Sequence, residues 1–174
     1  MDVIQAIKGR REITSFKEEK VSKEELDKVV EAGYLAPTGN NLPSREFIVV
    51  SKREMLDQLA NTTPFMPWLK EATGAVVITG RPIVSKYWIQ DASIASGFMW
   101  LRATELGLGV GFGAVYHHED ATESERREKW VRDLLHLPSD RRVIAILGLG
   151  YTKQLPKQKT LLAKSEIIYY DIYK

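Results

Sequence analysis

The hydrophobic positions of the chain switch several times between helical spacing and short continuous runs, with turn residues between them. Apolar residues recurring every three or four positions predict amphipathic helices, whereas short apolar runs bounded by turn signals predict strands. Helices are expected over residues 2–8, 22–35, 52–59, 85–106 and 122–135. Strands are expected over residues 47–50, 75–79, 109–115 and 143–149.

Two of the helices have recognisable start signals. Ser22 and Glu25 have the spacing of a capping box, and that helix should end before Pro37, because the residue before proline disfavours the helical region. Thr122 and Glu125 repeat the spacing and predict a second capping box.

The order of these elements predicts an α+β protein, a layered α/β sandwich in which helices flank a central mixed sheet of four strands. We expect one domain over residues 1–174, with a C-terminal arm from about residue 151. The 85–106 helix carries Trp88 and Trp100 and is apolar on more than one face, which is typical of a helix buried in a core or between subunits. The apolar ending, residues 167–173, predicts a fifth strand or an arm packed against something.

Composition excludes several classes of function. The chain has no cysteine, which excludes disulfides, thiolate catalysis and cysteine-ligated metals. Its net charge of +2 is small and its charges are interleaved, so we expect no nucleic-acid partner and no membrane surface. There is no signal-peptide pattern and no apolar run near the roughly 20 residues of a membrane helix, so we expect a cytoplasmic protein.

The loop over residues 36–47 is longer than an economical turn. Its side chains are mostly small or amide-bearing, and such a loop can hold a flat polar ligand against its backbone. The residues concerned are Pro37, Thr38, Gly39, Asn40, Asn41 and Pro43.

Two basic elements lie near opposite ends of the chain. Arg10 and Arg11 can fork onto phosphate oxygens, because each guanidinium presents several fixed donors. Lys157 and Lys159 follow the last predicted strand. Each element alone also fits a solvated basic corner, but together they could hold one phosphate from both ends of the chain.

The glycine string from Gly107 to Gly113 does not fit a dinucleotide-binding fingerprint, which requires a strand, a glycine turn and then a helix. Here a helix precedes the glycines, so Gly107 is expected to end it. The strand glycines favour either close packing or a backbone N–H at Gly113 or Ala114 that points at a ligand. Residues 64–68 could be an apolar lid or part of the core, and no metal site is assigned to His117 and His118. Because no acid, base or nucleophile stands out, a cofactor is expected to carry the chemistry.

These segments occur in the order found in a known family. The motifs are A-I-K-G-R-R, A-P-T-G-N-N, D-A-S-I-A, E-L-G-L-G-V-G-F-G and L-P-K-Q-K. Over nearly its full length the chain resembles the nitroreductase-like FMN-dependent NAD(P)H oxidoreductases. The resemblance implies an obligate homodimer in which the long helix crosses the interface and the C-terminal strand or arm embraces the partner.

The resemblance also implies a role for each matching residue. The FMN phosphate would be held by Arg10, Arg11, Lys157 and Lys159. The loop containing Pro37, Thr38, Gly39 and Asn41 would touch the flavin from the partner subunit, and Gly113 or Ala114 would give a backbone N–H to flavin N5.

Three positions of the cofactor-binding segments depart from the family pattern. Glu12 stands where serine is common, and Thr14 stands where arginine or lysine is frequent. Leu42–Arg45 replaces the usual x-Q-P-W. We therefore expect a weaker grip on the phosphate and altered contacts on the substrate side.

The function implied by the resemblance is reduction of nitroaromatics, quinones or similar acceptors by NADH or NADPH, with ping-pong hydride transfer through flavin N5. One alternative is a specialised member of the same fold, either flavin-destroying or dehalogenating. The other is a flavin-binding or structural dimer with little turnover, which Glu12 favours.

Overall fold

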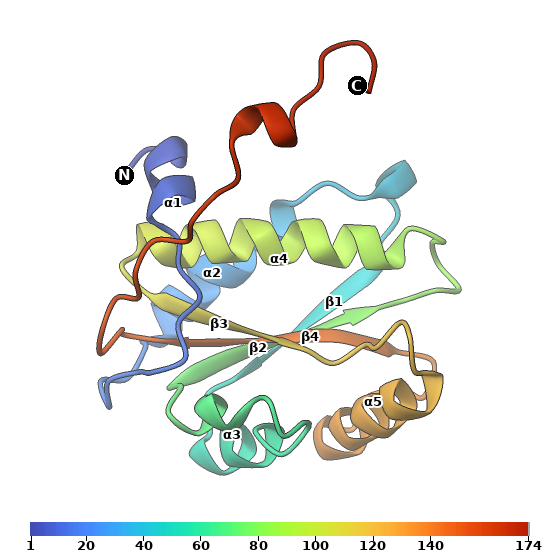
Figure 1. The fold of residues 1–174 in the computed structure, drawn as a ribbon. Coiled ribbons are helices and arrows are strands. Elements are labelled where there is room, and N and C mark those ends of the chain that lie inside the picture. The colour runs from blue at the N-terminus through green and yellow to red at the C-terminus, as the bar shows by residue number, and fades with distance from the viewer. Residues whose placement is uncertain (174) are drawn as a thin grey trace.

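Four strands form one sheet in the order β1-β2-β4-β3 in the computed structural model, which describes residues 1–173 (Figure 1). The strands are β1 Arg45–Val50, β2 Gly74–Gly80, β3 Gly109–Ala114 and β4 Arg142–Gly150. All three neighbouring pairs are antiparallel, so the predicted mixed sheet is wrong in this respect. The strand positions themselves agree with the prediction to within about two residues.

Helices cover both faces of this sheet, which confirms the α+β layered prediction. They are α1 Val3–Gly9, α2 Lys23–Leu35, α3 Arg53–Leu59, α4 Trp88–Glu105 and α5 Ala121–Leu135. Short 3₁₀ turns are η1 Gly39–Asn41, η2 Pro67–Lys70 and η3 Lys164–Glu166. Figure 1 shows α2 and α4 on one face and α3 and α5 on the other. None of the helices in residues 1–173 is long and apolar enough to cross a membrane.

Alternate side chains of the central strands supply two separate cores. Every residue of β2 is buried. Val76 and Ile78 pack in the core beneath α2 and α4, whereas Ala75 and Val77 pack in the core beneath α3 and α5. This division follows from the two-residue period of a strand, which sends successive side chains to opposite faces.

The helix start signals were predicted correctly in one case and wrongly in the other. The Ser22 capping box is confirmed, since Ser22 Oγ accepts from Glu25 N at 3.2 Å and the Glu25 carboxylate accepts from Ser22 N at 2.8 Å. Helix α5 instead begins at Ala121, one residue before Thr122. Its N-cap is Asp120, whose Oδ1 accepts from Glu123 N at 2.9 Å, so this carboxylate takes the capping role predicted for Thr122.

The glycines around β3 allow close approach. Gly107 has φ +80° just after α4, which confirms that it ends this helix. A Cβ on Gly111 would lie 2.6 Å from the Trp68 ring, and one on Gly113 would lie 1.8 Å from Met66 Sδ. Within residues 64–68, Met66 is buried and Trp68 packs against the same core, whereas Pro64, Phe65 and Pro67 are exposed.

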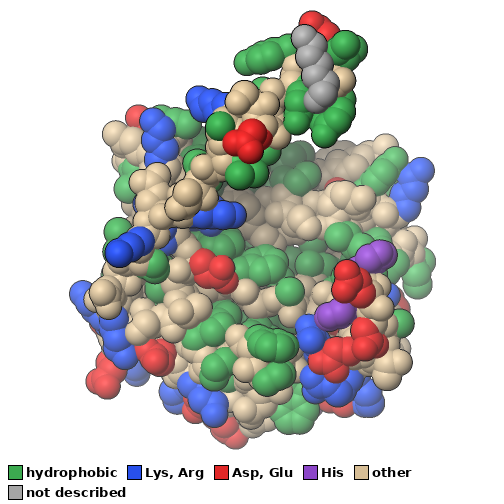
Figure 2. Space-filling model, in the orientation of Figure 1, with side chains coloured by type: hydrophobic (Ala, Val, Ile, Leu, Met, Phe, Trp, Pro, Cys, Tyr) green, Lys and Arg blue, Asp and Glu red, His purple; other side chains and the backbone are tan. Residues whose placement is uncertain are grey.

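The chain beyond β4 leaves the sheet. Thr152 forms a bridge with Phe16, and from there to residue 173 the chain contains η3 and no strand. Figure 1 shows this tail rising away from the sheet. The predicted C-terminal strand would pair with the sheet of a partner subunit, so it stays a prediction. Nine large apolar side chains of the tail are exposed: Leu155, Leu161, Leu162, Ile167, Ile168, Tyr169, Tyr170, Ile172 and Tyr173. In Figure 2 the tail projects from the body, and the surface beneath it is hollowed.

Candidate functional site

The segment after α1 runs along the outer edge of β3 and meets the start of the tail. Ile13 N donates to Val110 O at 2.9 Å, and Lys17 N donates to Tyr151 O at 2.8 Å. Glu71 strengthens the junction. Its carboxylate accepts from Lys153 Nζ at 2.9 Å and from Phe16 N at 3.1 Å, and these bonds lower the pKa of Glu71. The fold thus brings together the two ends of the chain that carry the predicted phosphate ligands.

Arg10 lies on an aromatic platform next to β3. Its guanidinium is 4.9 Å from the centre of the Trp100 ring, a distance typical of a cation–π contact. Trp100 is in turn stacked on Phe112 of β3, with ring centres 6.1 Å apart and an angle of 6° between the planes. Arg10 is exposed, so this contact sets its position without withdrawing its charge from solvent.

Arg11 is held differently from Arg10. Its Nη1 donates to the carbonyl oxygens of Lys8 at 2.8 Å, Gly9 at 3.2 Å and Arg10 at 2.8 Å, which satisfies the free carbonyls at the end of α1. Its Nε is buried and has no hydrogen-bond partner within residues 1–173. An anionic oxygen at this point would supply the missing acceptor.

Four candidate residues around this segment remain: Glu12, Thr14, Lys157 and Lys159. Glu12 and Thr14 flank the buried Ile13 and are exposed, because side chains alternate along the extended segment. Lys157 and Lys159 lie in the exposed part of the tail. Across residues 1–173, neither Glu12 nor either lysine makes a salt bridge.

The loop after α2 has a defined shape that a buried carboxylate maintains. Asn40 and Asn41 have φ of 56° and 55°, in the left-handed region that asparagine tolerates better than most residues. Asp91 of α4, only 3% exposed, accepts from Gly39 N at 2.8 Å and from Ser44 Oγ at 2.5 Å. Pro37 and Asn41 stay exposed, with Thr38 and Gly39 half-buried. The sequence motif D-A-S-I-A contains Asp91, but its spacing gave no sign of this role.

The last two residues of the stretch Leu42–Arg45 are bonded within their own chain. Ser44 is fully buried, and Arg45 Nη2 donates to Gly33 O at 2.9 Å and to the carbonyl of Ala36, so it caps the end of α2. The expected change in substrate contacts within Leu42–Arg45 can therefore come only from Leu42 and Pro43, which are exposed.

The hydrogen-bond pattern of β3 distinguishes between the two backbone candidates. The backbone groups of successive strand residues point to opposite edges. Val110 O bonds outward to Ile13 N, whereas Val115 N bonds inward to Ile144 O at 3.0 Å on the β4 side. Gly113 therefore faces β4, and Ala114 directs its N–H to the open edge of the sheet, where this residue is exposed.

Within one chain the loop and the arginines lie apart. The loop is anchored to α4 at Asp91 and Arg10 is anchored at Trp100, nine residues along, which is about 14 Å at 1.5 Å per residue. Figure 1 shows the loop after α2 and helix α1 near opposite ends of α4. The structure brings the arginines, β3 and the start of the tail together, and leaves the loop out of that group.

Comparison with solved structures defines the class of fold. The FMN-dependent nitroreductase from Clostridium difficile superposes with a TM-score of 0.89 at 33% identity, covering 98% of this chain and 99% of that one. The architecture described above is thus that of the nitroreductase fold.

Comparison with known sequences defines the family. A protein of Methanothermobacter thermautotrophicus, provisionally named NADH dehydrogenase/NAD(P)H nitroreductase, is 33% identical over 170 residues, which is 96% of this chain and 86% of that protein. A protein of the same provisional name from Archaeoglobus fulgidus is 34% identical over 87% of this chain and 86% of its own length. The model of the nitroreductase family matches residues 7–64. The chain belongs to the nitroreductase family.

Proposed function

We propose that this protein is a homodimeric FMN-dependent oxidoreductase that takes electrons from NADH or NADPH and passes them to nitroaromatics, quinones or similar acceptors. One observation carries the proposal. A free backbone N–H at Ala114, an exposed cation at Arg10 and an unsatisfied buried donor at Arg11 Nε lie along one side of the molecule, beside the open edge of β3. These donors suit a ligand with an anionic tail and a flat ring that accepts a hydrogen bond.

The residues of this chain fit FMN in defined roles. Arg10 and Arg11 would hold the phosphate from the N-terminal side, and Lys157 and Lys159 would hold it from the tail. Ala114 N–H would bond to flavin N5 and orient the ring. When bound, FMN supplies the redox chemistry, namely hydride transfer from NAD(P)H and then to the acceptor in two separate half-reactions. The protein provides shape, charge and exclusion of water.

The loop of Pro37, Thr38, Gly39 and Asn41 would complete the site of a partner subunit. The separation of about 14 Å along α4 supports this assignment, since the loop does not reach the arginines of its own chain. The exposed apolar side chains of the tail support association as well, because a surface of this kind usually marks an interface. Light scattering at the dimer mass is the expected result, and a monomer at micromolar concentration would contradict it.

The first test is identification of the cofactor. The purified protein should be yellow, should release FMN on heat denaturation, and should lose its flavin absorbance when NADH or NADPH is added without oxygen. A nitroaromatic or a quinone should then restore the absorbance. Colourless protein that does not bind added FMN would refute the proposal.

The second test addresses the phosphate ligands. Arg10→Ala and Lys157→Ala should each weaken FMN binding about tenfold or more, because a hydrogen bond to a charged group contributes about 1.5–3 kcal/mol. Lys129→Ala is the matched control, since Lys129 pairs with Asp133 on the exposed surface of α5. FMN dissociation constants that are the same in all three variants would remove the phosphate assignment while leaving the oxidoreductase assignment intact.

Glu12 favours a second candidate, a flavin-binding protein with little turnover. Its carboxylate is exposed beside Arg11 and has no ion pair in residues 1–173, so it would repel a phosphate bound there. Glu12→Gln should tighten FMN binding if the repulsion operates. If wild-type protein binds FMN but turns over no electron acceptor, the second candidate holds and the first fails.

A further inference from the structure

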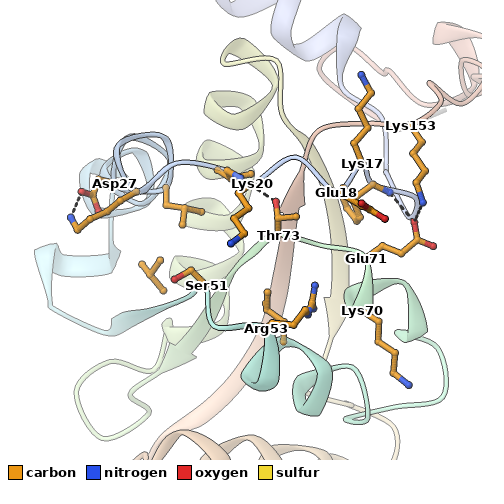
Figure 3. A pocket seen from close by; sticks show the side chains of 16 residues that line it. Lys17, Glu18, Lys20, Asp27, Ser51, Arg53, Lys70, Glu71, Thr73 and Lys153 are labelled. Atoms are coloured by element: carbon orange, nitrogen blue, oxygen red, sulfur yellow. Dashed lines mark hydrogen bonds and ion pairs between the residues drawn. The ribbon is translucent and has the colours of Figure 1, made fainter.

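A cavity of about 830 Å³ opens at the end of the sheet opposite to Ala114, and it contains none of the residues assigned to FMN (Figure 3). Its walls come from the segment 16–27, the end of β1, the start of α3, the end of η2 and Lys153 after β4. A volume of this size lies in the range of pockets that hold small organic molecules.

The floor of this cavity is apolar and preformed. Phe16, Leu26 and Leu56 line it, and each is at most 2% exposed. The wall above them is fixed at both ends, because Phe16 N donates to the Glu71 carboxylate at 3.1 Å and Val21 N donates to Thr73 Oγ1 at 3.2 Å. These three side chains form the packed base beneath the cavity, and Val49, which is 42% exposed, offers apolar surface to a ligand at the wall.

The rim has more positive than negative groups. Six cationic side chains line the cavity, Lys17, Lys20, Lys23, Arg53, Lys70 and Lys153, against three carboxylates, Glu18, Asp27 and Glu71. Two of the carboxylates are already paired, Asp27 with Lys23 at 2.5 Å and Glu71 with Lys153 at 2.9 Å. Lys17, Lys20 and Lys70 have no ion-pair partner anywhere in residues 1–173, so the rim keeps an excess of positive charge.

Two of these cations face the same space. Figure 3 shows the Lys20 side chain directed into the space between Ser51 and Arg53. Arg53 is held in place by its bonds to Asp57 Oδ1 at 3.0 Å and to the carbonyls of Ala72 at 2.9 Å and Leu69 at 3.4 Å. These bonds use three of the five guanidinium N–H groups, so two are left for a ligand.

We propose that this cavity binds a small organic anion. Its ring or chain packs against Val49, above the base formed by Phe16, Leu26 and Leu56, and its carboxylate or phosphate contacts Lys20 and Arg53. The anion balances part of the excess positive charge of the rim and accepts hydrogen bonds from the free N–H groups of Arg53. This site is independent of the proposed flavin site, since no residue is shared between them.

The test uses the purified protein with its bound cofactor and three probes of equal ring size, 1-naphthoate, 1-naphthyl phosphate and the uncharged 1-naphthalenemethanol. Isothermal titration calorimetry should show saturable binding of one anion per chain, weakened by added salt, and little binding of the alcohol. The tighter of the two anions identifies the preferred acid group.

Two lysine variants decide where the anion binds. Lys20→Met should weaken its binding about tenfold or more. Lys52→Met is the matched control, because Lys52 lies between Ser51 and Arg53 in the sequence, is exposed and does not line the cavity. FMN content should stay the same in both variants. Equal affinity for anion and alcohol, absence of saturation, or equal loss in both variants would overturn the proposal.

Discussion

Replacing Asp91 by alanine should destabilise the protein by about 2–4 kcal/mol. The substitution removes two hydrogen bonds to a buried carboxylate, from Gly39 N and from Ser44 Oγ, and each such bond contributes about 1.5–3 kcal/mol. The sum is reduced because Gly39 is half-buried and its N–H can bond to water in the variant. The fully buried Ser44 hydroxyl has no such replacement, so its desolvation cost of about 1–3 kcal/mol remains.

Urea denaturation followed by circular dichroism measures the free energy of unfolding, and FMN titration of the folded variant measures the effect on the site. FMN affinity should fall as well, because the loop from Pro37 to Asn41 loses its anchor. Asp91→Asn keeps one acceptor and should recover part of both losses. The control is Asp133→Ala, which breaks an exposed pair with Lys129 and should cost less than about 1 kcal/mol. If Asp91→Ala were no more costly than this control, the anchoring role of Asp91 would be wrong.

Three further predictions concern Glu128 and Gly39. Glu128 is fully buried and its carboxylate accepts from Arg142 Nε at 2.8 Å, so Glu128→Gln should cost about 3 kcal/mol in urea denaturation, and a loss below about 1 kcal/mol would contradict this. Burial by itself raises the pKa of Glu128, but the bonds from Arg142, a hydroxyl and a backbone N–H outweigh it, and the pKa lies below its usual value. A carboxylate whose pKa is lowered by folding contributes stability that is lost on acidification. The difference in free energy of unfolding between wild type and Glu128→Gln should therefore shrink as pH falls below about 4.3. An equal difference at pH 7 and pH 3 would refute this prediction. Finally, a Cβ on Gly39 would lie 2.4 Å from the Tyr87 ring. Gly39→Ala should therefore displace the loop, lower the affinity for FMN and reduce stability by about 1–3 kcal/mol. An unchanged dissociation constant for FMN would count against the loop assignment.

The elements of the fold could be predicted because their signals are local. The apolar run of β2 is buried at all seven positions, and the spacing of Ser22 and Glu25 describes a contact within one helical turn. The direction of the strands is not local. It depends on which edges pair, and the sequence pattern of an interior strand is the same in a mixed and in an antiparallel sheet. Asp120 and Thr122 lie two positions apart and both have side chains that can cap a helix. Spacing alone did not show which of the two is the N-cap of α5.

The sequence predicts which residue types belong to the candidate site, but it does not reveal the hydrogen-bond partners of those residues. The sequence predicts a joint role for Arg10 and Arg11 at a phosphate, which stays a prediction. A pattern of charges does not reveal that Arg11 also bonds to carbonyls at the end of its own helix. Asp91 was missed because its partners Gly39 and Ser44 are 52 and 47 positions away in the sequence. The choice of Ala114 over Gly113 required the hydrogen-bond pattern of β3.

If the protein is the proposed homodimer, its exposed tail should make its stability depend on protein concentration. Its nine large apolar side chains are between 37% and 82% exposed, so their burial adds little to the folding of an isolated chain. In the proposed homodimer this area is buried only on association, and the free energy of association then adds to that of folding. The midpoint temperature of unfolding should accordingly rise with protein concentration. Dilution would then inactivate the protein before heat does, because separated subunits lose the loop that each contributes to the other.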